Sequence, residues 1–137
     1  MVDVFTVQKR SEVMRAIKGK DTKPELIVRR LVHGLGYRYR LHRRDLPGTP
    51  DLVFVKRRKI IFVHGCFWHG HAACKGGHLP KSNGTYWAAK IERNRARDKR
   101  AVRVLRSSGW RVMTVWECQT DRLERLAAAI SRFLDRE

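Results

Sequence analysis

The stretch DLVFVKRRKIIFVHG, residues 51–65, sets the architecture of this chain. Two apolar runs rich in β-branched and aromatic residues, at 51–55 and 59–63, flank a short basic segment. Runs of this length around a polar turn are typical of two paired, buried strands. Because paired strands run side by side, we expect Asp51, which opens the first strand, and His64, which follows the second, at the same end of the sheet.

Helical patterns surround these strands. Thr22 and Glu25 have the spacing of a capping box, and the apolar residues that follow repeat at helical intervals until Gly34. A longer helical pattern covers 87–105, and Thr120 is expected to cap a final helix. Further elements are predicted as a short helix at 11–18 and strands at 37–41 and 110–116. This order predicts an α/β fold, in which helices flank a mixed β-sheet.

The composition is that of one strongly basic domain. The 137 residues suffice for a single core, with residues 1–10 as a loosely ordered arm. Lys and Arg number 31 against 13 Asp and Glu, which gives a formal net charge of +18. The densest basic runs lie at 38–44, 56–59 and 93–100, and any one of them could be a solvated surface. Together they favour a polyanionic partner, because so much like charge destabilises a compact fold; nucleic acid is expected.

No segment is suited to a membrane. The apolar runs, such as 60–63, are far shorter than the roughly 20 residues that cross a bilayer, and the first residues lack the apolar core of a signal peptide. We therefore expect no membrane partner and a cytoplasmic, nucleoid-associated protein. In that reducing compartment, cysteines are more often metal ligands or buried thiols than disulfides.

Three cysteines and a histidine have the types and spacing of zinc ligands. Cys66, His71 and Cys74 form the pattern C-x4-H-x2-C, and Cys118 directly follows the last predicted strand. If that strand lies beside the one that precedes the loop, Cys118 completes a closed Cys3His set, which is typical of structural zinc. Two alternatives remain. His78 is a rival fourth ligand, and the cysteines could be small buried hydrophobes.

Two histidines and three carboxylates are then left for chemistry. A histidine titrates near neutral pH, as proton transfer requires, although His64 and His69 could each be an ordinary hydrogen-bonding residue. Asp51 is suited to Mg²⁺, which typically takes one or two carboxylates together with water and phosphate oxygens. Glu25 and Asp98 could support this site, or could only cap a helix and pair with neighbouring arginines.

Five ordered blocks of the sequence closely resemble the very-short-patch repair (Vsr-type) T:G mismatch DNA endonucleases. The blocks are MRAIKGKDTKPE (14–25), LPGTPDLVF (46–54), IFVHGCFWHGH (61–71), YWAAKIERNRARD (86–98) and GWRVMTVWEC (109–118). The resemblance runs from about residue 9 to residue 134, which is nearly the whole chain. Five blocks in the same order, at compatible separations, are far more specific than any one of them.

The resemblance implies a restriction-endonuclease-like fold that uses Mg²⁺ to nick double-stranded DNA on the 5′ side of the thymine in a T:G mismatch. It implies that Asp51 binds this metal together with the backbone carbonyl of Val63, and that His69 is the general base for the attacking water. It places further side chains around the metal and the scissile phosphate: His64, Asp98 and Glu25. It also assigns Cys66, His71, Cys74 and Cys118 to a structural zinc.

Two features of the strand at 59–63 bear on this resemblance. Most restriction-like nucleases have a lysine on the second catalytic strand, whereas this chain has Phe62, Val63 and His64 there. Histidine chemistry must therefore replace the lysine, and the family that this chain resembles generally makes that replacement. Members of the family often have a hydroxyl residue at the position of Val63. If only the main-chain oxygen binds metal the change is tolerable, but any role of the side chain is lost.

The resemblance also implies that large apolar side chains wedge into the base stack beside the mismatch. These are Met14, Phe67, Trp68 and Trp87. Wedging costs free energy for each unstacked step, and a mispair lowers this cost, so intercalation can itself discriminate. The alternative is that the aromatic residues belong to the core, above all Trp87.

Three functions are consistent with the sequence. The first is a monomeric mismatch-nicking endonuclease, with mismatch-repair proteins as candidate partners; a monomer suffices because a nick in one strand needs one active site. The second is a restriction or defence nuclease of another DNA specificity. The third is a noncatalytic, zinc-stabilised DNA-binding module, which would leave the grouping of Asp51, His64 and His69 unexplained.

Overall fold

A computed structural model describes residues 22–67, 69, 71 and 84–136 of the chain. In chain order the elements are helix α2 (Lys23–Gly34), strands β1 (Arg40–Leu41), β2 (Leu52–Phe54) and β3 (Lys59–His64), helix α3 (Gly84–Ser107), strand β4 (Arg111–Trp116), the 3-10 helix η2 (Glu117–Asp121) and helix α4 (Leu123–Asp135). The predicted α/β fold is confirmed. The helix predicted at 11–18 and the arm predicted at 1–10 lie outside the described residues. Within the described part of the chain, no helix is long and apolar enough to cross a membrane.

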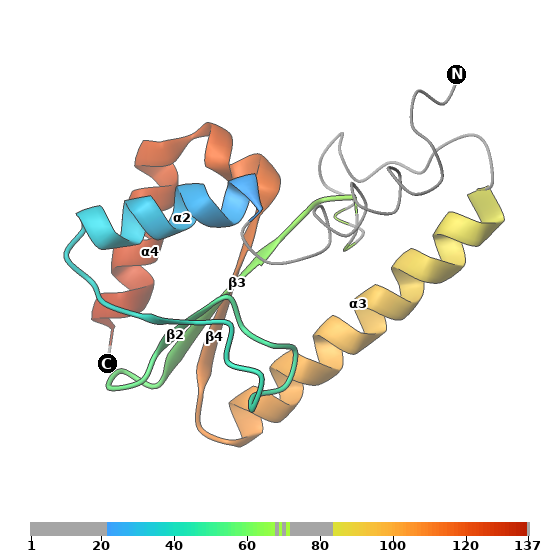
Figure 1. Cartoon of the computed structure of the whole chain (residues 1–137), viewed down its shortest axis with the longest axis horizontal. Helices are drawn as coiled ribbons and strands as arrows, with labels where there is room; N and C mark the ends of the chain where they lie inside the picture. The colour runs from blue at the N-terminus through green and yellow to red at the C-terminus, as the bar shows by residue number, and fades with distance from the viewer. Residues whose placement is uncertain (1–21, 68, 70, 72–83, 137) are drawn as a thin grey trace.

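The four strands form one mixed sheet in the order β1-β2-β3-β4. The pairs β1–β2 and β2–β3 are antiparallel, whereas β3 and β4 are parallel, with Lys59 opposite Arg111 and His64 opposite Trp116. Parallel neighbours need a long crossover connection, and α3 lies within that connection (Figure 1). The residues that follow β3 and β4 therefore leave the sheet at the same end.

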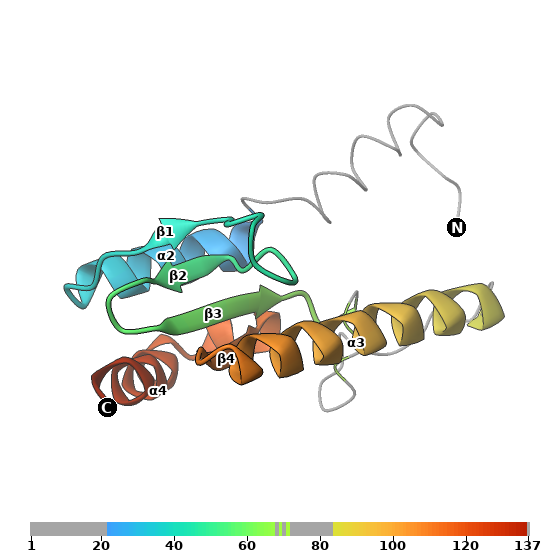
Figure 2. The same ribbon diagram turned by 90° about the horizontal axis from the view of Figure 1, so that it is seen from below.

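Helices cover both faces of the sheet. Helices α2 and α4 lie on one face and α3 lies on the other (Figures 1 and 2). Because alternate strand residues point to opposite faces, Ile61 and Val115 pack with α2 and α4, whereas Ile60 and Phe62 pack with Leu105 of α3. Each face therefore has its own apolar core.

The strand predicted at 37–41 is largely wrong, because only Arg40–Leu41 pairs with β2. Tyr39 lies outside this short ladder. Its hydroxyl donates to the carbonyl of Arg29 on α2, 3.3 Å away. A contact with the helix thus takes the place of strand pairing.

Both predicted helix caps are also wrong. Thr22 is the N-cap residue of α2, but its side chain makes no capping hydrogen bond, and Glu25 turns towards a basic cluster instead. Thr120 lies inside η2, where its hydroxyl donates to the carbonyl of Glu117 at 2.7 Å. Helix α4 begins at Leu123, so the short 3-10 helix occupies the place of the expected cap.

Candidate active site and metal centre

Asp51 lies where β3 ends. It immediately precedes β2, which runs antiparallel to β3, and its Oδ2 atom accepts a hydrogen bond from the backbone N–H of Val63 at 2.7 Å. His64 is the next residue and the last of β3. The sequence predicted that Asp51 and the end of this strand would meet, and they do. The backbone N–H of Val63 makes this contact, whereas the expected role of Val63 in binding metal belongs to its carbonyl oxygen.

The carboxyl group of Asp51 is costly to ionise. Burial raises its pKa to about 6, although the N–H of Val63 and the nearby basic groups of His42, His69 and Arg29 all lower it. A buried carboxylate gains stability from an opposite charge placed next to it. Asp51 is therefore suited to hold a cation.

A second carboxylate, Glu25, lies beside Asp51 and is held by two basic side chains. Glu25 is only 2% exposed, and its Oε2 atom pairs with the guanidinium of Arg29 and lies 2.9 Å from Nε2 of His42. The ligand atoms of Glu25, His42 and Asp51 all lie within 4.8 Å of one another. The structure thus brings the predicted Glu25 to Asp51 and adds His42 to the site.

His42 was missed by the sequence analysis. It follows β1, 17 residues from Glu25, and its backbone is left-handed, with a φ of 47°. Its N–H donates to the carbonyl of Asp51 at 3.3 Å, so the chain holds the imidazole next to both carboxylates. In the sequence, His42 lies within the basic run at 38–44. The only signal there is a single histidine among arginines.

His69 has the geometry of a proton acceptor. Its Nδ1 atom lies 2.6 Å from Oδ2 of Asp98, which projects from α3. An ionised carboxylate only accepts hydrogen bonds, so Nδ1 carries the hydrogen and Nε2 is the basic nitrogen of the neutral ring. The predicted His69 and Asp98 are therefore brought together as a pair.

His64 packs against one face of the His69 ring. The two imidazole rings are stacked, with centroids 3.8 Å apart and planes within 5° of parallel. His64 is 7% exposed, and burial together with the neighbouring His69 lowers its pKa to about 4, although Asp98 opposes this shift. His64 is thus neutral at pH 7 and adds no positive charge next to His69.

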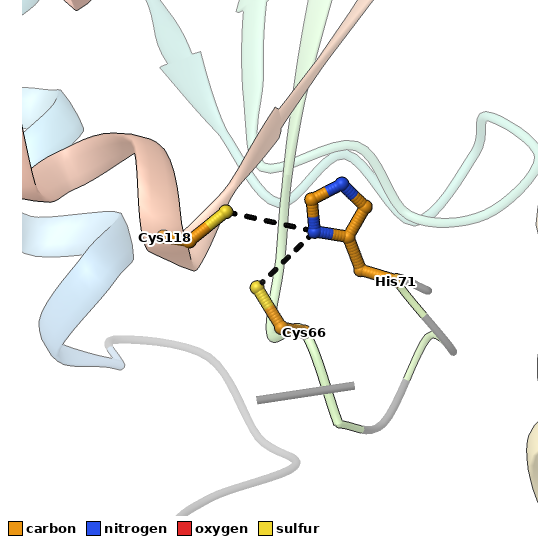
Figure 3. A group of neighbouring side chains, drawn as sticks. All are labelled: Cys66, His71 and Cys118. Atoms are coloured by element: carbon orange, nitrogen blue, oxygen red, sulfur yellow. Dashed lines mark hydrogen bonds between the residues drawn. The ribbon is translucent and has the colours of Figure 1, made fainter. Parts of the chain in front are cut away.

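Three of the four predicted zinc ligands meet beyond the ends of β3 and β4 (Figure 3). Nδ1 of His71 lies 3.6 Å from Sγ of Cys66 and 3.5 Å from Sγ of Cys118. A tetrahedral Zn²⁺ separates its ligands by about this much, since Zn–S is about 2.3 Å and Zn–N about 2.0 Å. These donors fit a structural zinc. Cys74 and His78, the alternative fourth ligand, lie outside the described residues.

Aromatic side chains gather near the start of α3, apart from both apolar cores. The rings of Phe67 and Trp87 meet edge to face with centroids 5.3 Å apart, and both residues are half-buried. Tyr86, which the sequence analysis did not single out, is 56% exposed and contacts Trp87 at 5.1 Å. Trp87 is part of neither core cluster. Trp68 and Met14 lie outside the described residues.

A His–Asp pair beside the carboxylates of Glu25 and Asp51, on an α/β scaffold with a large positive charge, is typical of one class of protein: enzymes that hydrolyse phosphodiesters in nucleic acid. The profile of the family described as DNA mismatch endonuclease Vsr matches residues 2–75. The chain belongs to this family and is a DNA endonuclease.

Three relatives illustrate the similarity. Type II nicking enzyme V.XorIIP of Xanthomonas oryzae pv. oryzae is 52% identical over 135 residues, with 98% of each chain covered. Type II nicking enzyme V.NmeAIP of Neisseria meningitidis serogroup A is 43% identical, over 95% of this chain and 97% of the relative. DNA mismatch endonuclease Vsr of Escherichia coli is 41% identical, over 92% of this chain and 80% of the relative.

Proposed function

We propose that this endonuclease nicks one strand of duplex DNA on the 5′ side of the thymine in a T:G mismatch. The nicking reaction is supported by one observation: the His69–Asp98 pair lies near the half-buried Asp51. With Nδ1 bonded to Asp98, Nε2 of His69 takes the proton of the water that attacks the scissile phosphate. Asp98 keeps the ring in this tautomer, and His64 keeps it in place by stacking.

Magnesium is the metal that best fits the part of the site that contains Asp51 and Glu25. Asp51 and the backbone oxygen of Val63 would hold it, with Glu25 and His42 around them. Carboxylate and carbonyl oxygens are its usual ligands in proteins. When bound, the ion offsets the negative charge that builds up on the phosphate in the transition state.

The second metal is a structural zinc, held by Cys66, His71, Cys74 and Cys118. A closed Cys3His set has no open position for substrate, so its contribution is to the fold. The set joins the loop after β3 to Cys118, the second residue of η2. His69 lies within that loop, so the zinc fixes the position of the general base.

The aromatic cluster supplies the mismatch recognition. Phe67 and Trp87, together with Trp68 and Met14, wedge between bases next to the T:G pair. The support is that Phe67 contacts Trp87, the fourth residue of α3, and that neither residue belongs to a core cluster. A mispaired step is cheaper to unstack than a paired one, which favours the mismatch.

A nicking assay tests this proposal. Two duplexes that differ only in carrying T:G or T:A at one position are incubated with and without Mg²⁺. We expect cleavage of the thymine strand only in the T:G duplex with Mg²⁺. Asp51→Ala should abolish nicking and retain binding of the mismatched duplex. Equal cleavage of the T:G and T:A duplexes would refute the mismatch specificity.

A second function, strand nicking with another DNA specificity, is favoured by the relatives that are named type II nicking enzymes. It predicts cleavage that depends on the surrounding sequence and not on the mismatch. In either case we propose that one restriction-endonuclease-like domain acts as a monomer, because a nick needs one His–Asp pair and one metal site. Mismatch-repair proteins remain proposed partners of the first function only.

A further inference from the structure

A groove of about 420 Å³ lies between α3 and β4. His64 and His69 line the end where β3 and β4 stop, and Thr114 and Trp116 line it from β4. The groove is thus continuous with the proposed general base. On the other side of the two histidines, towards β2, lies Asp51, since the strand order is β1-β2-β3-β4.

The α3 side of this groove is basic. Four cationic residues of the helix line it, Arg95, Lys99, Arg103 and Arg106, together with Asp98, whose carboxylate pairs with His69. The four cations are spaced by four, four and three residues, which puts them within an arc of about 80° and spreads them over about 16 Å of the helix. All four are exposed, and no ion pair between described residues engages any of them.

A row of cations this long matches a strand of phosphates. Each strand of duplex DNA carries one phosphate per about 3.4 Å of helix axis, so a 16 Å row spans several phosphates. Guanidinium groups bind phosphate oxygens bidentately, and three of the four cations are arginines. An isolated small anion would use one or two of these groups and leave the others uncompensated.

We propose that this groove binds the sugar–phosphate backbone of the duplex beside the scissile phosphate. The proposal rests on the proposed function, because the backbone is expected to enter the groove from the site at His69. It goes further by assigning backbone contacts to Arg95, Arg103 and Arg106, none of which is part of the His–Asp pair or of the metal sites. These contacts set affinity and register, and they are the same for matched and mismatched duplexes.

Salt dependence of binding tests the groove. Affinity for a labelled T:G duplex is measured without Mg²⁺, so that no cleavage is needed, at NaCl concentrations from about 0.05 to 0.3 M. The variant R95Q/R103Q/R106Q should bind roughly tenfold or more weakly at 0.15 M NaCl. Its plot of log affinity against log salt should be shallower by about 3, since each lost phosphate contact removes about 0.9 from the slope.

A matched control removes the same number of arginines from the other helix layer. R30Q/R125Q/R132Q changes three exposed residues of α2 and α4, on the face of the sheet away from the groove. This control should keep the slope of the wild type to within about one unit. Equal slopes and affinities for the two triple variants would overturn the proposal.

Two further measurements keep the outcome clear. If the groove variant melts at a lower temperature than the control, single variants such as Arg103→Gln replace it, each expected to lower the slope by about one. Inorganic phosphate, added at constant ionic strength, should leave the difference between variant and wild type unchanged; if it removes that difference, the groove is a site for free phosphate and the proposal fails. A wild type that binds but nicks no duplex would refute the proposed function and still leave the slope comparison valid.

Discussion

The imidazole of His42 holds the carboxylate of Glu25 next to Asp51, and a single substitution can separate this role from a purely structural one. Without His42, the buried Glu25 keeps Arg29 as a partner but loses its contact at 2.9 Å. We expect His42→Ala to raise the Mg²⁺ concentration for half-maximal nicking by about tenfold or more, as for other residues that orient metal ligands. A Mg²⁺ titration of the nicking rate measures it.

His42→Gln is the conservative control, because a glutamine amide can donate to Oε2 of Glu25. In this variant, the Mg²⁺ concentration for half-maximal nicking should be close to that of the wild type. If both variants melt at a lower temperature but need no more Mg²⁺, then His42 serves the fold and not the metal site.

At the scale of elements, the loop that leads into β2 is pressed against α3 at Gly48. Its φ is +77°, and a Cβ atom there would lie 2.9 Å from Cβ of Ala101 and 3.2 Å from the ring of Phe62. Gly48→Ala should therefore destabilise the protein by roughly 2–4 kcal/mol, through left-handed strain and overpacking. Urea unfolding measures this, and the nicking rate should fall with it, because Asp51 is three residues further on.

Gly34→Ala is the matched control for this loop. A Cβ atom at Gly34, the last residue of α2, meets nothing within 4 Å, so the change should be neutral or stabilising by about 0.5–1 kcal/mol. If the two alanine variants were equally stable, close packing of the loop on α3 would not be what positions Asp51.

The proposed zinc joins two elements that are far apart in the sequence. Cys118→Ser should reduce bound zinc to less than one per chain and lower the melting temperature by roughly 10 °C or more, because a structural zinc contributes several kcal/mol to folding. His69→Ala should retain one zinc per chain while nicking is lost. Metal analysis of both purified variants checks that His71 binds zinc and that His69 does not. Loss of zinc from His69→Ala would contradict this assignment.

Local spacing predicted much of this arrangement and failed where distant elements meet. Residues 51–65 carry a strand pair in their own pattern, and the parallel pairing of β3 with β4 then brings Cys118 to His71. The capping box at Glu25 failed because the same carboxylate is bound by His42, whose position depends on the turn between β1 and β2. Sequence spacing records which side chain can cap a helix, but not which tertiary partner competes for it.

At the scale of the whole molecule, the +18 charge gives stability and DNA binding opposite responses to salt. Like charges repel one another in the compact state, and salt screens this repulsion, since the Debye length falls from about 10 Å at 0.1 M to about 3 Å at 1 M. We expect the melting temperature of the zinc-loaded protein to rise by a few degrees between about 0.05 and 0.5 M NaCl, while affinity for duplex DNA falls steeply.

The two responses can be separated with the arginine variants. R30Q/R125Q/R132Q and R95Q/R103Q/R106Q each remove three positive charges, so both should show a weaker rise of the melting temperature with salt than the wild type. Only the groove variant should also lose slope in DNA binding, because repulsion depends on the total charge whereas phosphate contacts depend on where the charges lie. Calorimetry over the salt series measures the first response. A melting temperature that stays constant or falls with NaCl would mean that attraction within ion pairs of the protein, such as Arg29–Glu25 and Arg43–Asp45, outweighs the net repulsion.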